Sequence, residues 1–168
     1  MTVRVGVIGL GMGRHHARAY EASQLADLVA ICDVDPQRLA EYRALYPKAA
    51  AFTNYEDLLA SGTVDAVSVA LPTFLHDTVS VAALGAGVHV LCEKPMAVNA
   101  ERAKAMLDAS RAAGRKLMIH FNYRYSPSAQ YLKRYVDAGN LGQLYYARTR
   151  WLRAHGVPKP GGWFGIKE

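Results

Sequence analysis

The chain has 168 residues, of which 51% are apolar and 20% are charged, and this composition is typical of a globular protein rather than a disordered or fibrous one. Its formal net charge is +6, and no apolar run is long enough to cross a bilayer, so we expect no transmembrane segment. Two cysteines are too few for a disulfide framework or a four-cysteine zinc site, and the N-terminal residues do not resemble a secretory signal. We therefore expect a cytoplasmic protein without a metal site.

Short apolar strands alternate with helices over the first 122 residues. Strands are expected at residues 3–9, 28–32, 51–52, 64–71, 88–91 and 117–121. Helix starts are marked by Asp35 before Pro36, by Asn54 and by Asn99, and helix ends are marked by Gly87 and Gly114. This alternation predicts an α/β fold with a doubly wound, mostly parallel sheet and helices on both of its faces.

The pattern changes near residue 123, so we expect one domain over residues 1–122 and the start of another over residues 123–168. A helix is expected at 127–138 and a strand at 144–152. Residues 111–168 carry 11 basic and 2 acidic residues and most of the aromatic ones, which is one feature of nucleic-acid-binding proteins. Because no nucleic-acid motif accompanies the charge, we favour a segment that packs on protein and expect no nucleic-acid partner.

A glycine-rich turn follows the first strand. Gly9 and Gly11 fit the first two positions of the dinucleotide fingerprint G-x-G-x-x-G, but Arg14 stands at the third, and Gly13 comes one residue early. Such glycines let the backbone approach a pyrophosphate at a helix N-terminus, although many strand-to-helix turns use glycine for structure alone. Asp33 lies 22 positions after Gly11 (33 − 11), near the spacing of an acid that binds the adenine ribose. It could instead cap the next helix, a role that Asp35 fills better.

Two further segments follow strands at the edge where open α/β sheets bind ligands. Residues 71–76 include Thr73 and His76; taken alone, Thr73 is better explained as a cap of the following helix and His76 as a surface residue of its first turn. The run Cys92-Glu93-Lys94-Pro95 places a lysine between an acid and a proline. A lysine there can act as an acid or a base, with Glu93 holding it, although a charged pair in a surface loop is common.

Together these motifs resemble the Gfo/Idh/MocA oxidoreductases. The resemblance rests on residues 6–16, Asp33, the segment 71–76, and the run from Ala86 to Pro95 with its Glu-Lys-Pro end. Residues 121–127 and 139–143 extend it, so it covers nearly the whole chain. It implies an NAD(P)-binding Rossmann domain followed by an α+β domain on a large open sheet. It also implies hydride transfer between a nicotinamide cofactor and a hydroxyl or carbonyl of a sugar, inositol or related polyol.

The resemblance also assigns roles to single residues. Lys94 matches the lysine that contacts the reacting hydroxyl and is the expected catalytic residue. The positions that match cofactor-binding ones are Gly9, Gly11, Met12 and Gly13 at the pyrophosphate, Leu71, Thr73 and His76 beside the nicotinamide half, Glu93 near the nicotinamide ribose, and Asn122 facing the same cleft. A Lys94–Pro95 bond in the cis form is expected as well.

The carboxylate of Asp33 predicts NAD as the cofactor, because it accepts hydrogen bonds from a ribose 2′-hydroxyl and repels a 2′-phosphate. NADP is the alternative, since Arg38 lies five residues further on and could reach a phosphate.

Members of this family are longer than this chain. Their second domain carries an aspartate–histidine pair for which this sequence has no match. The alternative function is therefore a dinucleotide-binding module without catalytic activity. We also expect homo-oligomers formed through the strand at 144–152, because an unpaired strand edge favours pairing with another copy.

Overall fold

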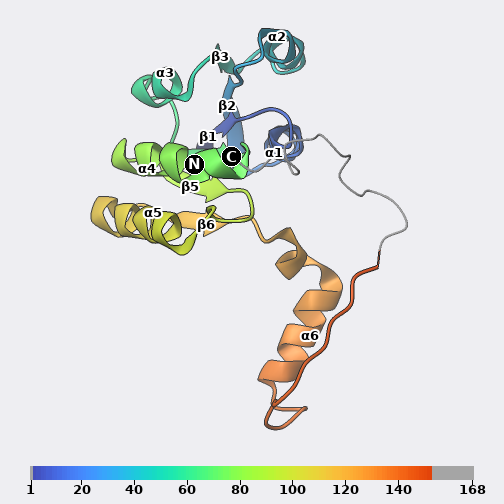
Figure 1. Cartoon of the computed structure of the whole chain (residues 1–168). Coiled ribbons are helices and arrows are strands. Elements are labelled where there is room, and N and C mark those ends of the chain that lie inside the picture. Colours follow the sequence, from blue (N-terminus) through green and yellow to red (C-terminus); the bar gives the residue numbers. More distant parts are fainter. Residues whose placement is uncertain (1, 153–168) are drawn as a thin grey trace. The chain divides into compact units, whose positions relative to one another are not determined.

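The computed structural model of the chain describes residues 2–152 (Figure 1). The chain forms two compact units that divide between Phe121 and Asn122. None of the helices within the described residues is both long enough and apolar enough to cross a membrane.

The first unit is built on a six-stranded parallel sheet in the order β3-β2-β1-β4-β5-β6. The strands are β1 (Val3–Ile8), β2 (Ala26–Cys32), β3 (Ala50–Phe52), β4 (Ala66–Val69), β5 (His89–Cys92) and β6 (Leu117–Ile119). The order reverses between β1 and β4, which is the topological switch point of a Rossmann fold. The predicted α/β class and the parallel sheet are therefore confirmed.

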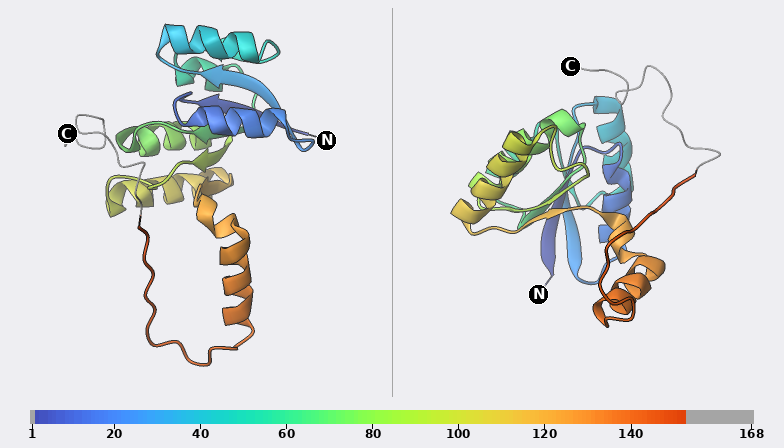
Figure 2. Two further views of the ribbon diagram at one scale, coloured as in Figure 1. Left: turned by 90° about the vertical axis from the view of Figure 1, so that its right-hand side faces the viewer. Right: turned by 60° about the horizontal axis from the view of Figure 1, so that its bottom comes forward.

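Helices cover both faces of this sheet (Figure 1, Figure 2). The helices are α1 (Gly13–Glu21), α2 (Pro36–Leu45), α3 (Tyr55–Ala60), α4 (His76–Gly85) and α5 (Ala100–Ala113), with the 3₁₀-helix η1 (Thr73–Leu75) before α4. One core cluster packs α3, α4 and α5 on the sheet around Leu58, Leu84 and Met106, and another packs α1 and α2 around Ala17 and Leu39. Burial on both sides explains why the strands are almost wholly apolar.

Helix boundaries follow from local hydrogen bonding. The Asp35 side chain accepts from the backbone N–H groups of Gln37 and Arg38 at the start of α2, and Asn54 and Asn99 cap α3 and α5 in the same way. Gly114 ends α5 in the left-handed region, with φ of 61°. These caps are the ones that the sequence predicts, because short polar side chains satisfy N–H groups that the first turn leaves free.

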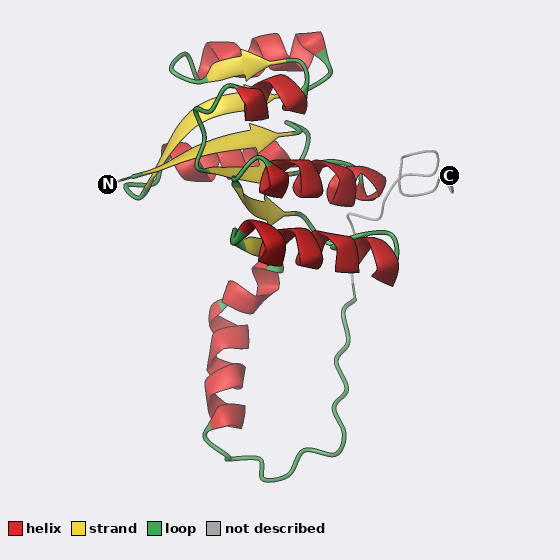
Figure 3. Ribbon diagram, turned by 90° about the vertical axis from the view of Figure 1, so that its left-hand side faces the viewer, coloured by secondary structure: helices red, strands yellow, loops and turns green. Residues whose placement is uncertain are grey.

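The second unit contains the 3₁₀-helix η2 (Asn122–Tyr125) and α6 (Pro127–Asp137), which Ser126 caps. The rings of Tyr123 and Trp151 pack edge to face with centroids 4.5 Å apart. The strand predicted at 144–152 was wrong: these residues have no regular secondary structure and run as a loop (Figure 3). A strand is stabilised by ladder hydrogen bonds to a neighbour, and no strand within residues 122–152 offers them. The Gly/Pro-rich residues 155–165 lie outside the described residues.

Candidate functional site

The carboxyl edge of the parallel sheet gathers the candidate site residues of the first unit. Gly9 follows β1, Asp33 follows β2, and Leu71 lies two residues beyond β4. Glu93 directly follows β5, and His120 directly follows β6. All six strands point the same way, so these segments share one edge and flank the switch point between β1 and β4. Ligands of open α/β sheets bind at this position.

The three glycines after β1 differ in backbone conformation and in the space around them. Gly9 has φ of +90°, and a Cβ there would lie 2.5 Å from the carbonyl oxygen of Ala70. A Cβ on Gly13 would lie 2.7 Å from Cγ1 of Val7, so Gly13 lets α1 pack closely on β1. A Cβ on Gly11 would meet nothing within 4 Å. The tight turn, the open approach and the helix–strand packing are the three roles of a dinucleotide fingerprint, although Gly13 comes one residue early.

Open backbone donors surround Gly11. Met12, the N-cap residue of α1, is 56% exposed, and no side chain within the described residues caps this helix. The free N–H groups and the positive end of the helix dipole favour an anion at this point.

Asp33 is buried and fully hydrogen-bonded at the end of β2. Its carboxylate accepts from the backbone N–H of Leu10 at 2.7 Å and that of Asp35 at 2.9 Å. The Arg38 guanidinium donates to both oxygens at 3.2 Å, and these are the longest contacts of the group. Asp33 therefore links the glycine loop to α2, and Arg38 stands beside it with a half-exposed side chain.

A cavity of about 320 Å³ lies next to Asp33. Its lining is mostly apolar and comes from the ends of β1 and β2, from α3 and from the segment after β4, including Gly9, Asp33, Tyr55, Leu71, Pro72 and Leu75. A flat heteroaromatic ring suits such a lining, since apolar walls fix a ring while a few polar groups orient what is attached to it.

His76 is buried, with 1% of its surface exposed. Its Nδ1 is hydrogen-bonded to the carbonyl oxygen of Pro95 at 2.7 Å, and its Nε2 to that of Leu71 at 2.8 Å. His76 thus ties the segment after β4 to the loop after β5, where the Lys94–Pro95 bond is cis, as expected. The surface reading of His76 was wrong, because the first turn of α4 faces the sheet.

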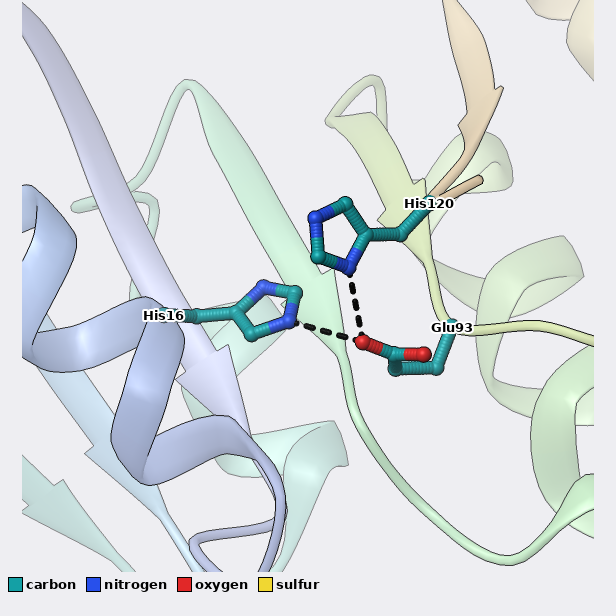
Figure 4. A group of neighbouring side chains, drawn as sticks. All are labelled: His16, Glu93 and His120. Atoms are coloured by element: carbon teal, nitrogen blue, oxygen red, sulfur yellow. Dashed lines mark hydrogen bonds and ion pairs between the residues drawn. The ribbon is translucent and has the colours of Figure 1, made fainter. Parts of the chain in front are cut away.

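Glu93 lies at the centre of a partly buried cluster with His16 of α1, which is buried, and His120, which follows β6 and whose side chain is 31% exposed (Figure 4). Its Oε1 accepts from Nε2 of His16 at 3.0 Å and from Nδ1 of His120 at 2.8 Å. Its Oε2 accepts from the backbone N–H of Lys94 at 3.1 Å. Burial alone raises the pKa of Glu93, but these hydrogen bonds outweigh it and lower the pKa to about 2.

The cluster continues away from Glu93. Nδ1 of His16 lies 3.1 Å from Oγ of Ser68, on β4, and that oxygen lies 2.6 Å from the Tyr20 hydroxyl. The rings of His16 and His120 meet edge to face with centroids 4.7 Å apart.

Not every predicted site residue takes part in this arrangement. The Lys94 side chain is exposed beside Glu93, and Thr73 is half-buried in η1, so both lie at the carboxyl edge. Asn122 begins the second unit, and its role stays a prediction. Sequence reasoning gave no role to His16 or to His120. His120 falls inside the strand expected at 117–121, so the one signal for it was a histidine near the end of an apolar strand; β6 ends at Ile119, which places His120 at the carboxyl edge.

Comparison with known proteins places this geometry in a family. The profile of the Gfo/Idh/MocA oxidoreductases, described as an oxidoreductase family with an NAD-binding Rossmann fold, matches residues 3–121. The chain belongs to this family. Its glycine loop, Asp33 and Glu-Lys-Pro run all lie within or directly beside the sheet of the matched region.

Several dehydrogenases of known function are similar in sequence to this Gfo/Idh/MocA chain. D-Glucoside 3-dehydrogenase of Escherichia coli is 37% identical over 166 residues, which are 96% of this chain and 46% of the relative. Inositol 2-dehydrogenase of Corynebacterium glutamicum is 35% identical over 150 residues, 88% of this chain and 44% of the relative. The chain spans about half the length of the curated relatives it matches.

Solved structures show the same fold. The WlbA dehydrogenase of Bordetella pertussis, in complex with NADH and UDP-GlcNAcA, has a TM-score of 0.81 and 33% identity, covering 86% of this chain and 45% of that one. The scyllo-inositol dehydrogenase of Lactobacillus casei, with bound NAD(H) and scyllo-inositol, has a TM-score of 0.80 and 29% identity, covering 84% and 43%.

Proposed function

We propose that the chain binds NAD across the carboxyl edge of its sheet and supplies Lys94 for hydride transfer between NAD and a hydroxyl of a sugar or polyol. The observation that carries the proposal is the convergence of the glycine loop, Asp33 and the Lys94 loop at the switch point of one parallel sheet. The relatives that act on glucosides and inositols support this substrate class.

The residues present fit the adenosine half of the cofactor. The apolar cavity next to Asp33 has room for an adenine ring, and the Asp33 carboxylate borders it. A carboxylate has about four lone-pair sites, and the two long Arg38 contacts occupy two of them. Ribose hydroxyls that replace Arg38 would leave the short bonds from Leu10 and Asp35 in place.

The glycine loop fits the pyrophosphate. Gly11 leaves open space where a side chain would stand, and the uncapped first turn of α1 offers N–H groups to the anion. A dinucleotide held at Asp33 and at this loop would extend across the switch point, so the residues after β4 and β5 would hold its nicotinamide half. Lys94 follows β5 and so lies at that half.

Bound NAD would supply the nicotinamide ring as the acceptor of the hydride from the alcohol carbon. The chain's own contribution is to take the hydroxyl proton, which we assign to the Lys94 amine, so that the alcohol becomes a carbonyl. A lysine takes up a proton in this way only where its surroundings favour the neutral amine. Because Lys94 is exposed in the first unit, we expect this chain to bind NAD and to turn over slowly.

The same exposure favours the second candidate, a module that binds the dinucleotide without chemistry. Both candidates are tested by titrating NAD into the chain and then following NADH formation with a panel of glucosides and inositols. We expect Lys94→Ala to bind NAD within about twofold of the wild type and to abolish any turnover, whereas Lys104→Ala on α5 changes neither. Binding without turnover on any substrate would favour the module, and absence of NAD binding would refute both candidates.

A further inference from the structure

The Glu93 cluster joins three parts of the site that are far apart in the sequence. His16 lies on α1, one turn after Gly13, while Glu93 and His120 follow β5 and β6. The backbone N–H of His120 also donates to the carbonyl oxygen of Cys92 at 2.7 Å, which fixes His120 at the end of β5. The cluster therefore connects the helix of the glycine loop with the loop that carries Lys94.

The hydrogen bonds form a chain with one consistent direction. Glu93 is charged and only accepts, so His16 must carry its proton on Nε2 and His120 on Nδ1. Nδ1 of His16 is then free to accept from the Ser68 hydroxyl, and Ser68 accepts in turn from Tyr20. With these proton positions each of the four hydrogen bonds has one donor and one acceptor.

Three accepted hydrogen bonds leave Glu93 one lone-pair site of about four. Two of the three come from the histidines and meet on Oε1, so they fix the plane of the carboxylate. The third, on Oε2, comes from the Lys94 backbone. The orientation of the carboxylate thus determines where the Lys94 N–H is held.

We propose that His16 and His120 are positioning residues for Lys94: they hold the Glu93 carboxylate, which in turn fixes the Lys94 backbone at the nicotinamide end of the site. The inference rests on the proposed function. It predicts an effect confined to one half of the cofactor, since Asp33 and its cavity border β2 and have no member in common with this cluster.

The alternative role of these three side chains is to bind a metal ion. Two histidines and one carboxylate are a known ligand set for divalent metals, and the three ligand atoms lie within 4.8 Å of one another. The contacts of 2.8 and 3.0 Å are ordinary hydrogen-bond lengths, and each takes a lone pair that a metal would need. We therefore favour the hydrogen-bonded cluster and make the metal an outcome of the test.

The test compares His120→Leu with His120→Asn in the full 168-residue chain. The amide nitrogen of asparagine stands close to where Nδ1 of histidine lies, so it keeps the donor to Glu93, while leucine removes it. The control is His89→Leu, which removes an imidazole that accepts from the Lys116 N–H at the opposite end of β5. Dissociation constants are measured for NAD and for ADP, which keeps the adenosine and the pyrophosphate but lacks the nicotinamide and its ribose.

We expect His120→Leu to weaken NAD binding about tenfold, because it displaces the Glu93–Lys94 backbone at the nicotinamide end and not the Lys94 side chain alone. ADP binding should stay within twofold. His120→Asn should restore NAD binding, and His89→Leu should change neither constant. Equal loss for both ligands, no loss for either, or no rescue by asparagine would overturn the inference. If the wild-type chain binds neither ligand, the proposed function and this inference are both refuted. If the wild type binds both ligands and His120→Leu does not weaken NAD binding selectively, only the inference is refuted.

A measurement on the wild type keeps the test valid if the leucine variant fails to fold. Nitrogen-15 NMR of the histidine rings should show the Nε2–H tautomer for His16 and the Nδ1–H tautomer for His120. Any other pair of tautomers overturns the inference. Stoichiometric Zn²⁺ binding that His120→Leu abolishes would assign the cluster to a metal and overturn it as well.

Discussion

Alanine substitutions at three glycines should separate backbone strain, steric clash and ligand contact. Gly9 has φ of +90° and would place a Cβ 2.5 Å from a backbone oxygen, whereas Gly62 has φ of +63° and open space around it. Gly11 has open space and a φ outside the left-handed region. Gly9→Ala therefore introduces both backbone strain and a steric clash, Gly62→Ala introduces backbone strain alone, and Gly11→Ala introduces neither.

The magnitudes follow from these geometries. A left-handed alanine costs about 1–2 kcal/mol, and a clash that the backbone must relieve costs about 1–3 kcal/mol. Gly9→Ala should thus lower the free energy of unfolding by about 2–5 kcal/mol, a large part of the roughly 5–15 kcal/mol of a typical domain. Gly62→Ala should lower it by about 1–2 kcal/mol, and Gly11→Ala by less than about 0.5 kcal/mol.

The assay is urea unfolding of the three variants, followed by NAD titration of those that fold. Gly11→Ala should weaken NAD about tenfold or more, equivalent to about 1.4 kcal/mol, because its methyl group fills the space assigned to the pyrophosphate. Gly62→Ala should leave NAD affinity unchanged. Stability losses at Gly11 equal to those at Gly9 would refute the reading of the loop geometry, and normal NAD affinity of Gly11→Ala would refute the pyrophosphate assignment.

Three further results are expected. The pKa of Glu93 is about 2 in the folded chain and 4.5 without its partners, so its carboxylate should add about 3 kcal/mol to the free energy of unfolding above pH 4.5. This stability is lost as the pH falls toward 2. Urea midpoints measured from pH 7 to pH 3 should therefore decrease with falling pH, and Glu93→Gln should weaken that dependence. The pKa of Asp65 is also about 2, but its pair with Arg4 is exposed, so Asp65→Asn should flatten the slope far less, and an equal effect would contradict the argument from burial. NAD should bind at least tenfold more tightly than NADP, and Asp33→Asn should narrow the ratio; equal binding of the two cofactors by the wild type would contradict the role of Asp33. Finally, the second unit should drive self-association, because its aromatic side chains are largely exposed, Tyr145 by 96%; light scattering that shows only monomer at high concentration would count against it.

Local signals predicted the first unit well because they act through neighbouring residues. Asn54, Asn99 and Gly114 begin and end helices through hydrogen bonds and dihedral angles that need no distant partner. The strand expected at 144–152 failed for the opposite reason, since a strand depends on a neighbour that alternation of residue types cannot supply.

The site shows the same division. Gly9, Asp33 and Lys94 were predicted at the carboxyl edge, because any residue that follows a parallel strand arrives there. The partners of Glu93 were not predicted, since His16 lies 77 positions away in sequence and reaches it only through the packing of α1 on the sheet. Periodicity places a residue on a face, but it does not identify which side chains meet across two elements.

The two buried thiols make the opening of this sheet measurable without any substitution in the chain. Cys32 and Cys92 end β2 and β5, on opposite sides of β1 and β4, and both are nearly inaccessible. Burial raises the pKa of each thiol to about 12, so at pH 8 only about one molecule in 10⁴ would carry the reactive thiolate even if reagent could enter. Labelling by a thiol reagent therefore requires local or global opening, and mass spectrometry of the two sites over time would show whether the adenine side and the nicotinamide side open together or separately.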